Sequence, residues 1–283
     1  MIESAKVTIL VNNFLEESEY WAEHGLSLLI QFFDNGVEKE ILVDTGLSGD
    51  VLVHNLNTLG ISLDRLTTIV ISHGHYDHIG GISRLLRFLG RPIQVILHPD
   101  IWGPRINTKP HPRDIGTKLT FEEIEREGGK IFASSEPVFL NEQLLTTGTI
   151  PRKEIEERNH SFQRIINKKL VDDEIMDDLA LILNLGTRGL FILTGCCHAG
   201  IINTIKHAIQ VTGNNKIKGI IGGLHLHGAS EERLSKTANY LKEIKPDLIA
   251  PLHCSGLKES FYLQQLIGPS VVFSGVGDEI VIY

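Results

Sequence analysis

Short apolar runs rich in β-branched residues alternate with helix-like patterns from one end of the 283-residue chain to the other. This alternation favours a layered α/β architecture in which strands interleave with helices. Hydrophobic residues make up 42% of the chain, which is enough to bury a core without disulfide bonds. We therefore expect an α/β fold in which most of the chain is ordered.

The periodicity and the turn residues predict individual elements. Strands are expected near 6–11, 26–33, 40–43, 67–71, 216–221, 247–251, 270–273 and 277–282, with a hairpin formed by 179–183 and 190–193. Helices are expected near 48–59, 79–89, 201–212, 229–243 and 257–266. The stretch 98–178 carries six of the ten prolines and less regular periodicity. We expect one domain over 1–283, with 98–178 as an insertion or lid.

Charge and cysteine content narrow the class of protein. With 27 Lys and Arg against 35 Asp and Glu, the net charge is −8, which disfavours nucleic acid and acidic membrane surfaces as partners. Three cysteines are too few for a disulfide framework and favour a reducing compartment. The first residues lack the basic and apolar regions of a secretory leader, and no apolar run approaches about 18 residues. We expect a cytoplasmic protein; its oligomeric state stays open.

A cluster of histidines follows the predicted strand at 67–71. The sequence His73-Gly74-His75-Tyr76-Asp77-His78 supplies four side chains of metal-binding type within six residues. Imidazole suits zinc, iron and manganese, and a carboxylate among imidazoles suits a hard or borderline divalent ion. Gly74 permits the tight backbone that lets the flanking histidines converge. A water-facing polar loop is the alternative, which the crowding of histidines at a glycine-flanked strand end disfavours.

The pattern His-x-His-x-Asp-His after a strand resembles the signature of the metallo-β-lactamase fold superfamily. The resemblance implies a four-layer αββα sandwich with one or two divalent ions, zinc being favoured over iron, manganese and magnesium. The segment Asp44-Thr45-Gly46 resembles the superfamily's upstream Asp-x-Gly element. It implies that Asp44 supports the metal ligands by hydrogen bonding. The alternative for Asp44 is the N-cap of the following helix.

Later strand ends offer three more histidines, and one loop cannot complete a metal site. They are His198 after 190–193, His225 after 216–221 and His253 after 247–251. The resemblance assigns the role of last metal ligand to His253. It also implies a metal-bridging aspartate near Cys196, and none stands there. We expect His198 to replace it, with Cys196, Cys197 and Asp178 as alternatives.

The combination Gly-Cys-Cys-His-Ala-Gly, Gly-Gly-Leu-His-Leu and His-Cys-Ser-Gly is similar to a dihydropteroate-synthase-like branch of the superfamily, which includes archaeal enzymes of methanopterin biosynthesis. The similarity extends from Val7 to about Gly277. It implies a transferase reaction in which a pterin-methyl diphosphate loses pyrophosphate while an arylamine attacks the methylene carbon. A phosphoester hydrolase and a non-catalytic metal- or ligand-binding protein are the alternatives. In each enzyme reading the partner is a small phosphorylated molecule.

The resemblance and the residue chemistry suggest roles for individual side chains. For hydrolysis, an ion held by His73, His75 and His198 would lower the pKa of a bound water toward about 7. A second ion at Asp77, His78 and His253 would lie roughly 3.5–4 Å away. Asp77 is also a candidate proton shuttle, and His225 is a candidate donor to a leaving group or an oxyanion.

Three further side chains are candidates for contact with substrate phosphate. Arg105 and Arg152 lie in the irregular stretch, and guanidinium groups bind phosphate oxygens well. Asn203 lies one turn into the helix after the cysteine pair, where a helix N-terminus favours an anion. For each arginine an ordinary surface position is the alternative.

Overall fold

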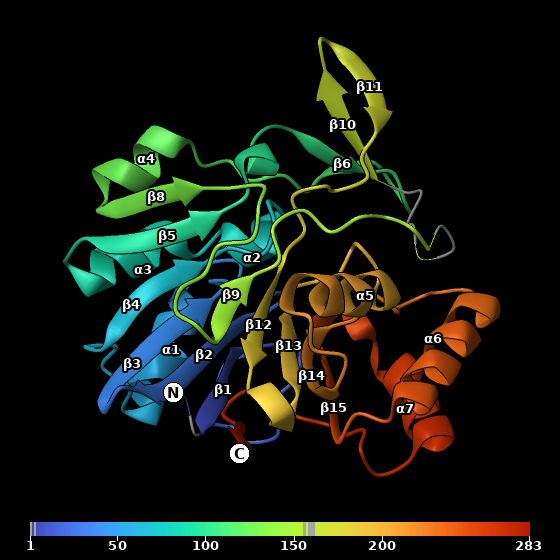
Figure 1. The fold of residues 1–283 in the computed structure, drawn as a ribbon. Coiled ribbons are helices and arrows are strands. Elements are labelled where there is room, and N and C mark those ends of the chain that lie inside the picture. Colours follow the sequence, from blue (N-terminus) through green and yellow to red (C-terminus); the bar gives the residue numbers. More distant parts are fainter. Residues whose placement is uncertain (1, 3, 155–156, 158–161) are drawn as a thin grey trace. The chain divides into compact units, whose positions relative to one another are not determined.

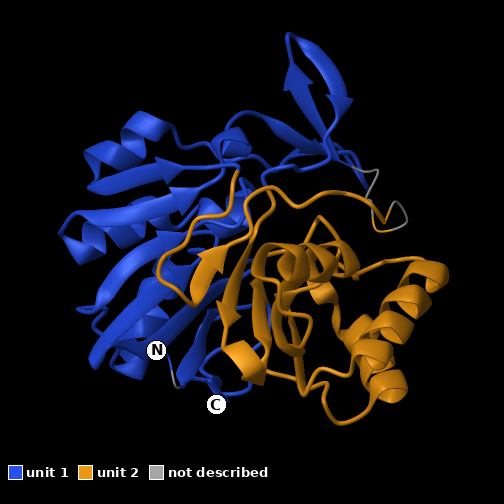
Figure 2. Ribbon diagram, viewed as in Figure 1, with its two compact units in different colours: residues 1–135, 159–177, 275–283 blue, residues 136–158, 178–274 orange. Residues whose placement is uncertain are grey.

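The computed structural model describes residues 2, 4–154, 157 and 162–283. The chain divides into two compact units (Figure 2). Unit 1 comprises 1–135, 159–177 and 275–283, and unit 2 comprises 136–158 and 178–274. Each unit has its own sheet and its own hydrophobic core, so both are α/β, as expected. A single domain over the whole chain stays a prediction.

Unit 1 is built on a seven-stranded sheet in the order β16-β1-β2-β3-β4-β5-β8 (Figure 1). The strands are β1 (Ala5–Val11), β2 (Ser27–Asp34), β3 (Val37–Val43), β4 (Leu66–Val70), β5 (Ile93–Leu97), β8 (Gly129–Ala133) and β16 (Glu279–Ile282). From β3 to β8 neighbouring strands are parallel, and the rest of the sheet is antiparallel. The carboxyl ends of β3, β4 and β5 therefore lie along one edge.

Helices α1 (Asp50–Leu59), α3 (Ile82–Leu89) and α4 (Phe121–Arg126) join the sheet of unit 1 in one buried cluster. Leu56, Leu85 and Ile124 of these helices pack with Ile69 and Val95 of the central strands. Because apolar residues recur at helical spacing, each helix buries one stripe and exposes the other. The single-turn helix α2 (Tyr76–Ile79) follows β4 and contributes Ile79 to the same cluster.

The stretch 98–178 is more ordered than its sequence suggests. A small antiparallel sheet in unit 1 has the order β11-β10-β6-β7, from β6 (Arg105–Asn107), β7 (Arg113–Asp114), β10 (Phe162–Ile166) and β11 (Lys169–Asp172). The β10–β11 hairpin extends away from the rest of unit 1 (Figure 1). Residues 136–158 of the same stretch belong to unit 2. The predicted insertion is thus divided between the two units; its role as a lid stays a prediction.

Unit 2 has a five-stranded sheet in the order β15-β14-β13-β12-β9. Its strands are β9 (Leu144–Thr146), β12 (Ala180–Asn184), β13 (Leu190–Thr194), β14 (Ile217–Gly223) and β15 (Leu248–Leu252), and its helices are α5 (Ile201–Thr212), α6 (Glu231–Ile244) and α7 (Leu257–Ile267). Strands β13, β14 and β15 are parallel. Short 3₁₀ turns complete the chain: η1 (Pro99–Ile101) in unit 1, and η3 (Gly186–Arg188) and η4 (His253–Ser255) in unit 2.

Two predicted elements differ from the structure. The helix expected at 79–89 is split into α2 and α3, and Gly80 and Gly81 lie between them. Both positions require glycine, because a Cβ at either would lie 2.1–2.2 Å from a carbonyl oxygen of residues 45–47. The strand expected at 270–273 is reduced to one isolated bridge between Val271 and Ile249. Among the described residues, none of the helices combines the length and the apolar character that crossing a membrane requires.

Candidate metal centre

In unit 1 the predicted cluster forms a compact histidine turn, defined as residues 73–78, just beyond β4. His73 and His78 are fully buried, and His75 and Asp77 are at most 5% exposed. His73 Nε2 lies 3.0 Å from His75 Nδ1, and the ring centroids of His73 and His78 are 4.3 Å apart. The structure therefore brings three imidazoles and one carboxylate together on a single turn.

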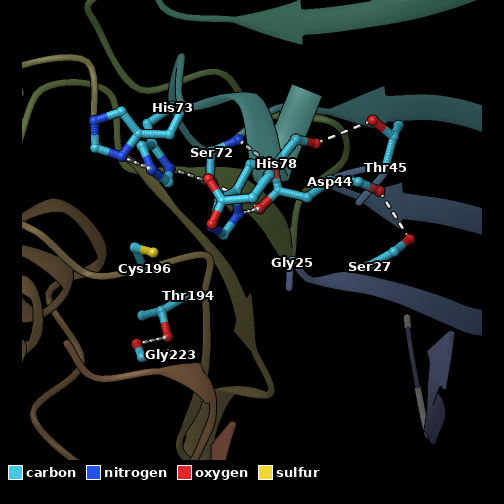
Figure 3. Close-up of polar contacts among 12 residues, drawn as sticks. Gly25, Ser27, Asp44, Thr45, Ser72, His73, His78, Thr194, Cys196 and Gly223 are labelled. Carbon is cyan, nitrogen blue, oxygen red and sulfur yellow. Dashed lines mark hydrogen bonds and ion pairs between the residues drawn. The ribbon is translucent and has the colours of Figure 1, made fainter. Parts of the chain in front are cut away.

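Asp44 holds this turn from the neighbouring strand, as predicted. Because β3 and β4 are parallel and Val43 pairs with Val70, the residues that follow them meet at the sheet edge. The Asp44 carboxylate accepts hydrogen bonds from the Ser72 backbone N–H (2.7 Å) and hydroxyl (2.7 Å), and it lies 2.6 Å from His78 Nδ1 (Figure 3). A carboxylate on Nδ1 fixes the imidazole and leaves Nε2 for a metal.

The alternative role of Asp44 as a helix N-cap is excluded. Helix α1 begins at Asp50, and its N-cap is Gly49. Asp44 has φ 59°, a left-handed conformation that aspartate tolerates better than most residues but that still strains the backbone. Its carbonyl oxygen accepts a 2.8 Å hydrogen bond from Ser27 Oγ. Such strain, held in place by several contacts, is common at functional sites.

A second carboxylate, Asp177, holds the histidine turn from another direction. Its Oδ2 accepts the Gly74 backbone N–H at 2.8 Å, and its Oδ1 lies 2.7 Å from Nη2 of Arg105. A Cβ at residue 74 would lie 2.1 Å from the Ile101 carbonyl oxygen, so glycine is required there. Sequence reasoning missed Asp177, because nothing local indicates that a residue about 100 positions later reaches the turn.

Arg105 is buried and paired with carboxylates of unit 1. Its side chain is 1% exposed, pairs with Asp177, and lies 3.6 Å from Asp173. Burial raises the pKa of Asp173, although the Arg105 charge opposes that shift. The guanidinium charge is thus already compensated inside unit 1. The predicted contact between Arg105 and substrate phosphate stays a prediction.

The electrostatics of the turn favour a neutral imidazole at His73. Burial, with the neighbouring His78 and His75, holds the pKa of His73 well below its usual range. Neutral imidazole is the form that binds metals. His73 belongs to two groups of side chains that could hold a metal ion, one that includes His75 and one that includes His78. Buried imidazoles, one of them held by a carboxylate, are donors of the type that divalent ions take.

His24 is a member of this region that sequence reasoning missed. Its Nε2 lies 3.1 Å from Asp77 Oδ2, and its side chain is 53% exposed, whereas that of Asp77 is 8% exposed. The backbone N–H of Leu26 also reaches the Asp77 carbonyl oxygen, at 3.4 Å. The only signal in the sequence is a His-Gly pair directly before the strand predicted at 26–33, which is too weak to interpret alone.

In unit 2 the candidate ligands lie at one edge of the sheet. Cys196, His225 and Cys254 are each the second residue beyond the end of their parallel strand, β13, β14 and β15. One potential ligand atom from each of the three lies within 4.8 Å of the others. The His198 ring lies beside the His225 ring, with centroids 4.4 Å apart and the ring planes tilted by 54°. Thr194 Oγ1 donates to the Gly223 carbonyl oxygen at 2.7 Å and joins two of these strand ends (Figure 3).

The two adjacent cysteines have different surroundings. Cys197 packs in the hydrophobic core of unit 2, and its Sγ lies 3.4 Å from Thr204 Oγ1. Burial raises the pKa of the Cys197 thiol well above its ordinary value, so it is a packing residue. Burial would also raise the pKa of Cys254, but hydrogen bonds with Cys196 and His225 hold it well below the ordinary value.

The N-terminus of helix α5, where we expect an anion, is already occupied by a carboxylate of the chain itself. The Glu157 carboxylate accepts hydrogen bonds from the backbone N–H groups of Ile202 (3.1 Å) and Asn203 (3.0 Å). The Asn203 side chain is buried and bonds to Glu154 N and Ala199 O, both at 2.8 Å. The Asn203 amide is therefore bonded within unit 2, and its predicted substrate contact stays a prediction. Arg152 Nη1 donates to the Ile150 carbonyl oxygen, and its predicted phosphate contact stays a prediction.

Comparison with known proteins places these features in a family. The model of the metallo-β-lactamase superfamily matches residues 21–155. A 7,8-dihydropterin-6-methyl-4-(β-D-ribofuranosyl)-aminobenzene-5′-phosphate synthase of Methanocaldococcus jannaschii is 31% identical over 272 residues, 93% of this chain and 92% of that protein. The chain belongs to the metallo-β-lactamase superfamily. It is an enzyme of that fold, and the superfamily typically binds divalent metals.

Further relatives agree with this superfamily assignment. An uncharacterized protein of the same archaeon is 33% identical over 92% of this chain and 94% of its own length. A solved metal-dependent hydrolase of the β-lactamase superfamily matches with TM-score 0.82 at 23% identity, covering 98% of each chain. Zinc-bound PqqB from Methylobacterium extorquens matches with TM-score 0.56 at 12% identity, covering 97% of this chain and 99% of that one. At such identities the structures establish the superfamily fold and nothing finer.

Within the superfamily, the residue that replaces the absent bridging aspartate stays a prediction. His198 is buried in the loop after β13. The Asp178 carboxylate accepts the backbone N–H of Ala199 at 2.9 Å and braces that loop. His253, the predicted last ligand, lies in η4 with φ 47° and is 8% exposed. Cys197, His225 and His253 all have positive φ, so backbone strain in unit 2 lies in the loops that carry the candidate ligands.

Proposed function

We propose that this enzyme is a dihydropteroate-synthase-like transferase. It joins a pterin-methyl diphosphate to an aminobenzene that carries a ribose phosphate. The C–O bond between the methylene carbon and the diphosphate breaks, and pyrophosphate leaves with the electron pair. A C–N bond forms between the methylene carbon and the arylamine nitrogen, which loses a proton. The observation that carries this proposal is the 31% identity with a pterin-phosphate synthase over 93% of the chain.

The histidine turn of unit 1 supplies the centre of the proposed site. His73, His75 and His78 would hold a divalent ion, zinc being favoured by the imidazole donors and magnesium by a diphosphate substrate. When bound, such an ion supplies Lewis-acid stabilisation of the negative charge on phosphate oxygens. His198 and His253 remain sequence predictions as additional ligands.

Asp77 and His24 support a role in proton transfer. The Asp77 side chain is 8% exposed, and its carboxylate would accept the proton from the arylamine nitrogen. The His24 ring, 3.1 Å away and half exposed, would pass that proton to solvent. The predicted donation from His225 to a leaving group is not part of the proposal, because its imidazole lies with two thiols in unit 2.

The reaction can be tested by following pyrophosphate and coupled product together. The purified enzyme is incubated with pterin-methyl diphosphate and a divalent metal, with and without the arylamine ribose phosphate. We expect pyrophosphate only when the arylamine is present, in equal amount to the coupled product measured by mass spectrometry. Pyrophosphate or phosphate release without the arylamine would instead identify a hydrolase. Tight binding of the substrates with no turnover would identify a non-catalytic binding protein.

A matched pair of histidine variants ties the reaction to the turn. His75→Ala removes an imidazole from the site, and His111→Ala removes an exposed imidazole elsewhere in unit 1. Loss of an outer-shell partner of a metal costs about 10–100-fold, so loss of a direct ligand should lower kcat/KM by at least about 100-fold. Circular dichroism should show both variants folded, because neither side chain belongs to the apolar core. Equal activity of the two variants would contradict the assignment of the histidine turn as the active site.

A further inference from the structure

Two cysteine thiols and a histidine imidazole lie at the carboxyl edge of the unit 2 sheet. Strands β13, β14 and β15 are adjacent and parallel, with Thr194 paired to Gly222 and Gly223 paired to Leu252. Residues that stand equally far beyond such strands lie side by side. Cys196, His225 and Cys254 occupy the same place, two residues past each strand, so the topology itself brings them together.

The side chains of these residues converge in the manner that a metal needs. One ligand atom of each, two Sγ atoms and one ring nitrogen, lies within 4.8 Å of the other two. Cys254 Sγ lies 3.3 Å from the Cys196 carbonyl oxygen. Tetrahedral ligands at 2.0–2.3 Å from an ion are themselves roughly 3.5–4 Å apart, so only small side-chain rotations separate this arrangement from a coordinating one.

The backbone around these three residues is shaped for close approach. A Cβ at Gly223 would lie 2.7 Å from Cys254 Sγ and 2.3 Å from the Gly195 carbonyl oxygen. Glycine at this position therefore makes room for the thiol. His225 has φ 48°, a left-handed conformation that is strained for histidine. Strain of this kind persists where the surroundings fix one side-chain direction, here toward the two cysteines.

The donor set selects the kind of metal. Two thiols and one imidazole are soft to borderline ligands that suit zinc and other late transition metals, and they do not suit magnesium or calcium. Three protein ligands leave one coordination position open, as in catalytic and not in closed structural zinc sites. This chemistry differs from the nitrogen and oxygen donors of the histidine turn in unit 1.

We infer that Cys196, His225 and Cys254 form a second metal site of Cys₂His type within unit 2, which binds a zinc-like divalent ion. Binding exchanges the two thiol protons for the ion and releases them to solvent, so one divalent cation replaces two protons. Gly223 and the parallel strands position the site. The inference goes beyond the proposed transferase reaction and does not depend on its substrates.

Cobalt substitution of the reduced, metal-free full-length chain tests this inference. Co²⁺ bound by thiolate gives a charge-transfer absorption in the near ultraviolet, which nitrogen and oxygen ligands do not give. Titration with Co²⁺ should produce an intensity that corresponds to two thiolates per ion. X-ray absorption of the zinc-loaded chain should show sulfur at about 2.3 Å. No sulfur band, or a band of one thiolate that survives loss of Cys254, would overturn the inference.

Variants separate this site from its surroundings. Cys254→Ser and His225→Ala should each weaken the sulfur-bound cobalt by more than the roughly 10–100-fold that loss of an outer-shell partner costs. Cys197→Ser is the matched control, because that thiol faces Thr204 in the core, and it should leave the band unchanged. His75→Ala should leave it unchanged too, even if it abolishes transferase activity. A band reduced by Cys197→Ser and not by Cys254→Ser would contradict the assignment.

Discussion

The two units of this chain present metal-binding side chains in different ways. In unit 1 four candidate ligands come from six consecutive residues, held by carboxylates from distant parts of the chain. In unit 2 the candidates come from three strand ends and include two thiols. The arrangement in unit 1 depends on a local motif that distant carboxylates hold in place. The arrangement in unit 2 depends on the order of the strands. A local motif is visible in sequence, whereas a site made by topology becomes visible only when the strands are paired.

Among the variants of unit 1, we expect Arg105→Met to have the largest effect, on the free energy of unfolding. Removing the guanidinium leaves Asp173 and Asp177 buried without their countercharge. Breaking one side of a buried ion pair costs about 3–5 kcal/mol, and we expect the free energy of unfolding to fall by that order. Urea denaturation measures it. Arg113→Met, an exposed arginine in the same small sheet, is the control and should change stability by less than about 0.5 kcal/mol. Equal losses in both variants would show that the buried pair is not what braces the turn.

Asp44→Asn should have a smaller effect, and on metal affinity more than on stability. Asparagine tolerates the left-handed backbone at this position, but it lacks the charge that orients His78. We expect affinity for Zn²⁺ to fall by about 10–100-fold, measured by competition with a chelating dye. Asp50→Asn, on the exposed first turn of α1, should leave the affinity unchanged. An Asp44→Asn protein of wild-type affinity would mean that the turn needs no such support.

The smallest effect concerns pH, where burial acts with opposite sign in the two units. It lowers the pKa of His73 in unit 1 and raises that of Glu157 in unit 2, because it disfavours the charged form of each. With its folded-state pKa raised, Glu157 costs stability as the pH rises above about 4.3, the ordinary pKa of glutamate, and through the raised value. Between pH 4 and pH 7 the melting temperature of Glu157→Gln should therefore vary less with pH than that of the wild type, as measured by thermal unfolding. An unchanged pH profile would show that the carboxyl group titrates normally.

Much of the fold could be predicted from sequence, because hydrophobic periodicity survives wherever an element packs on a sheet. The pattern of 179–183 and 190–193 predicted the β12–β13 hairpin. The helices expected near 48–59, 79–89 and 201–212 end where the structure places the C-caps Gly60, Gly90 and Gly213. The predicted strand at 270–273 is not formed, because β-branched residues favour an extended chain but the segment pairs with β15 only through Val271 and Ile249. The split of the helix at Gly80 follows from contacts with residues 45–47, which no local pattern contains.

The candidate site divides in the same way. The histidine turn and Asp44 were predicted because each directly follows a recognisable strand. The internal partners of Arg105 and Asn203 were not foreseen, because sequence gives a residue's type but not whether its polar atoms already have partners in the folded chain. Asp177 and His24 were missed because their contacts join segments about 50 to 100 residues apart. Such contacts are properties of the tertiary structure.

The most direct test of metal binding by the histidine turn is the metal content of the purified chain. Inductively coupled plasma mass spectrometry on protein prepared without chelators would compare the wild type with His75→Ala and Cys254→Ser. We expect bound divalent metal in the wild type, and we expect each variant to lose a different part of it, because the two side chains belong to different donor sets. Full retention of metal by His75→Ala would contradict the assignment of the histidine turn as a metal centre.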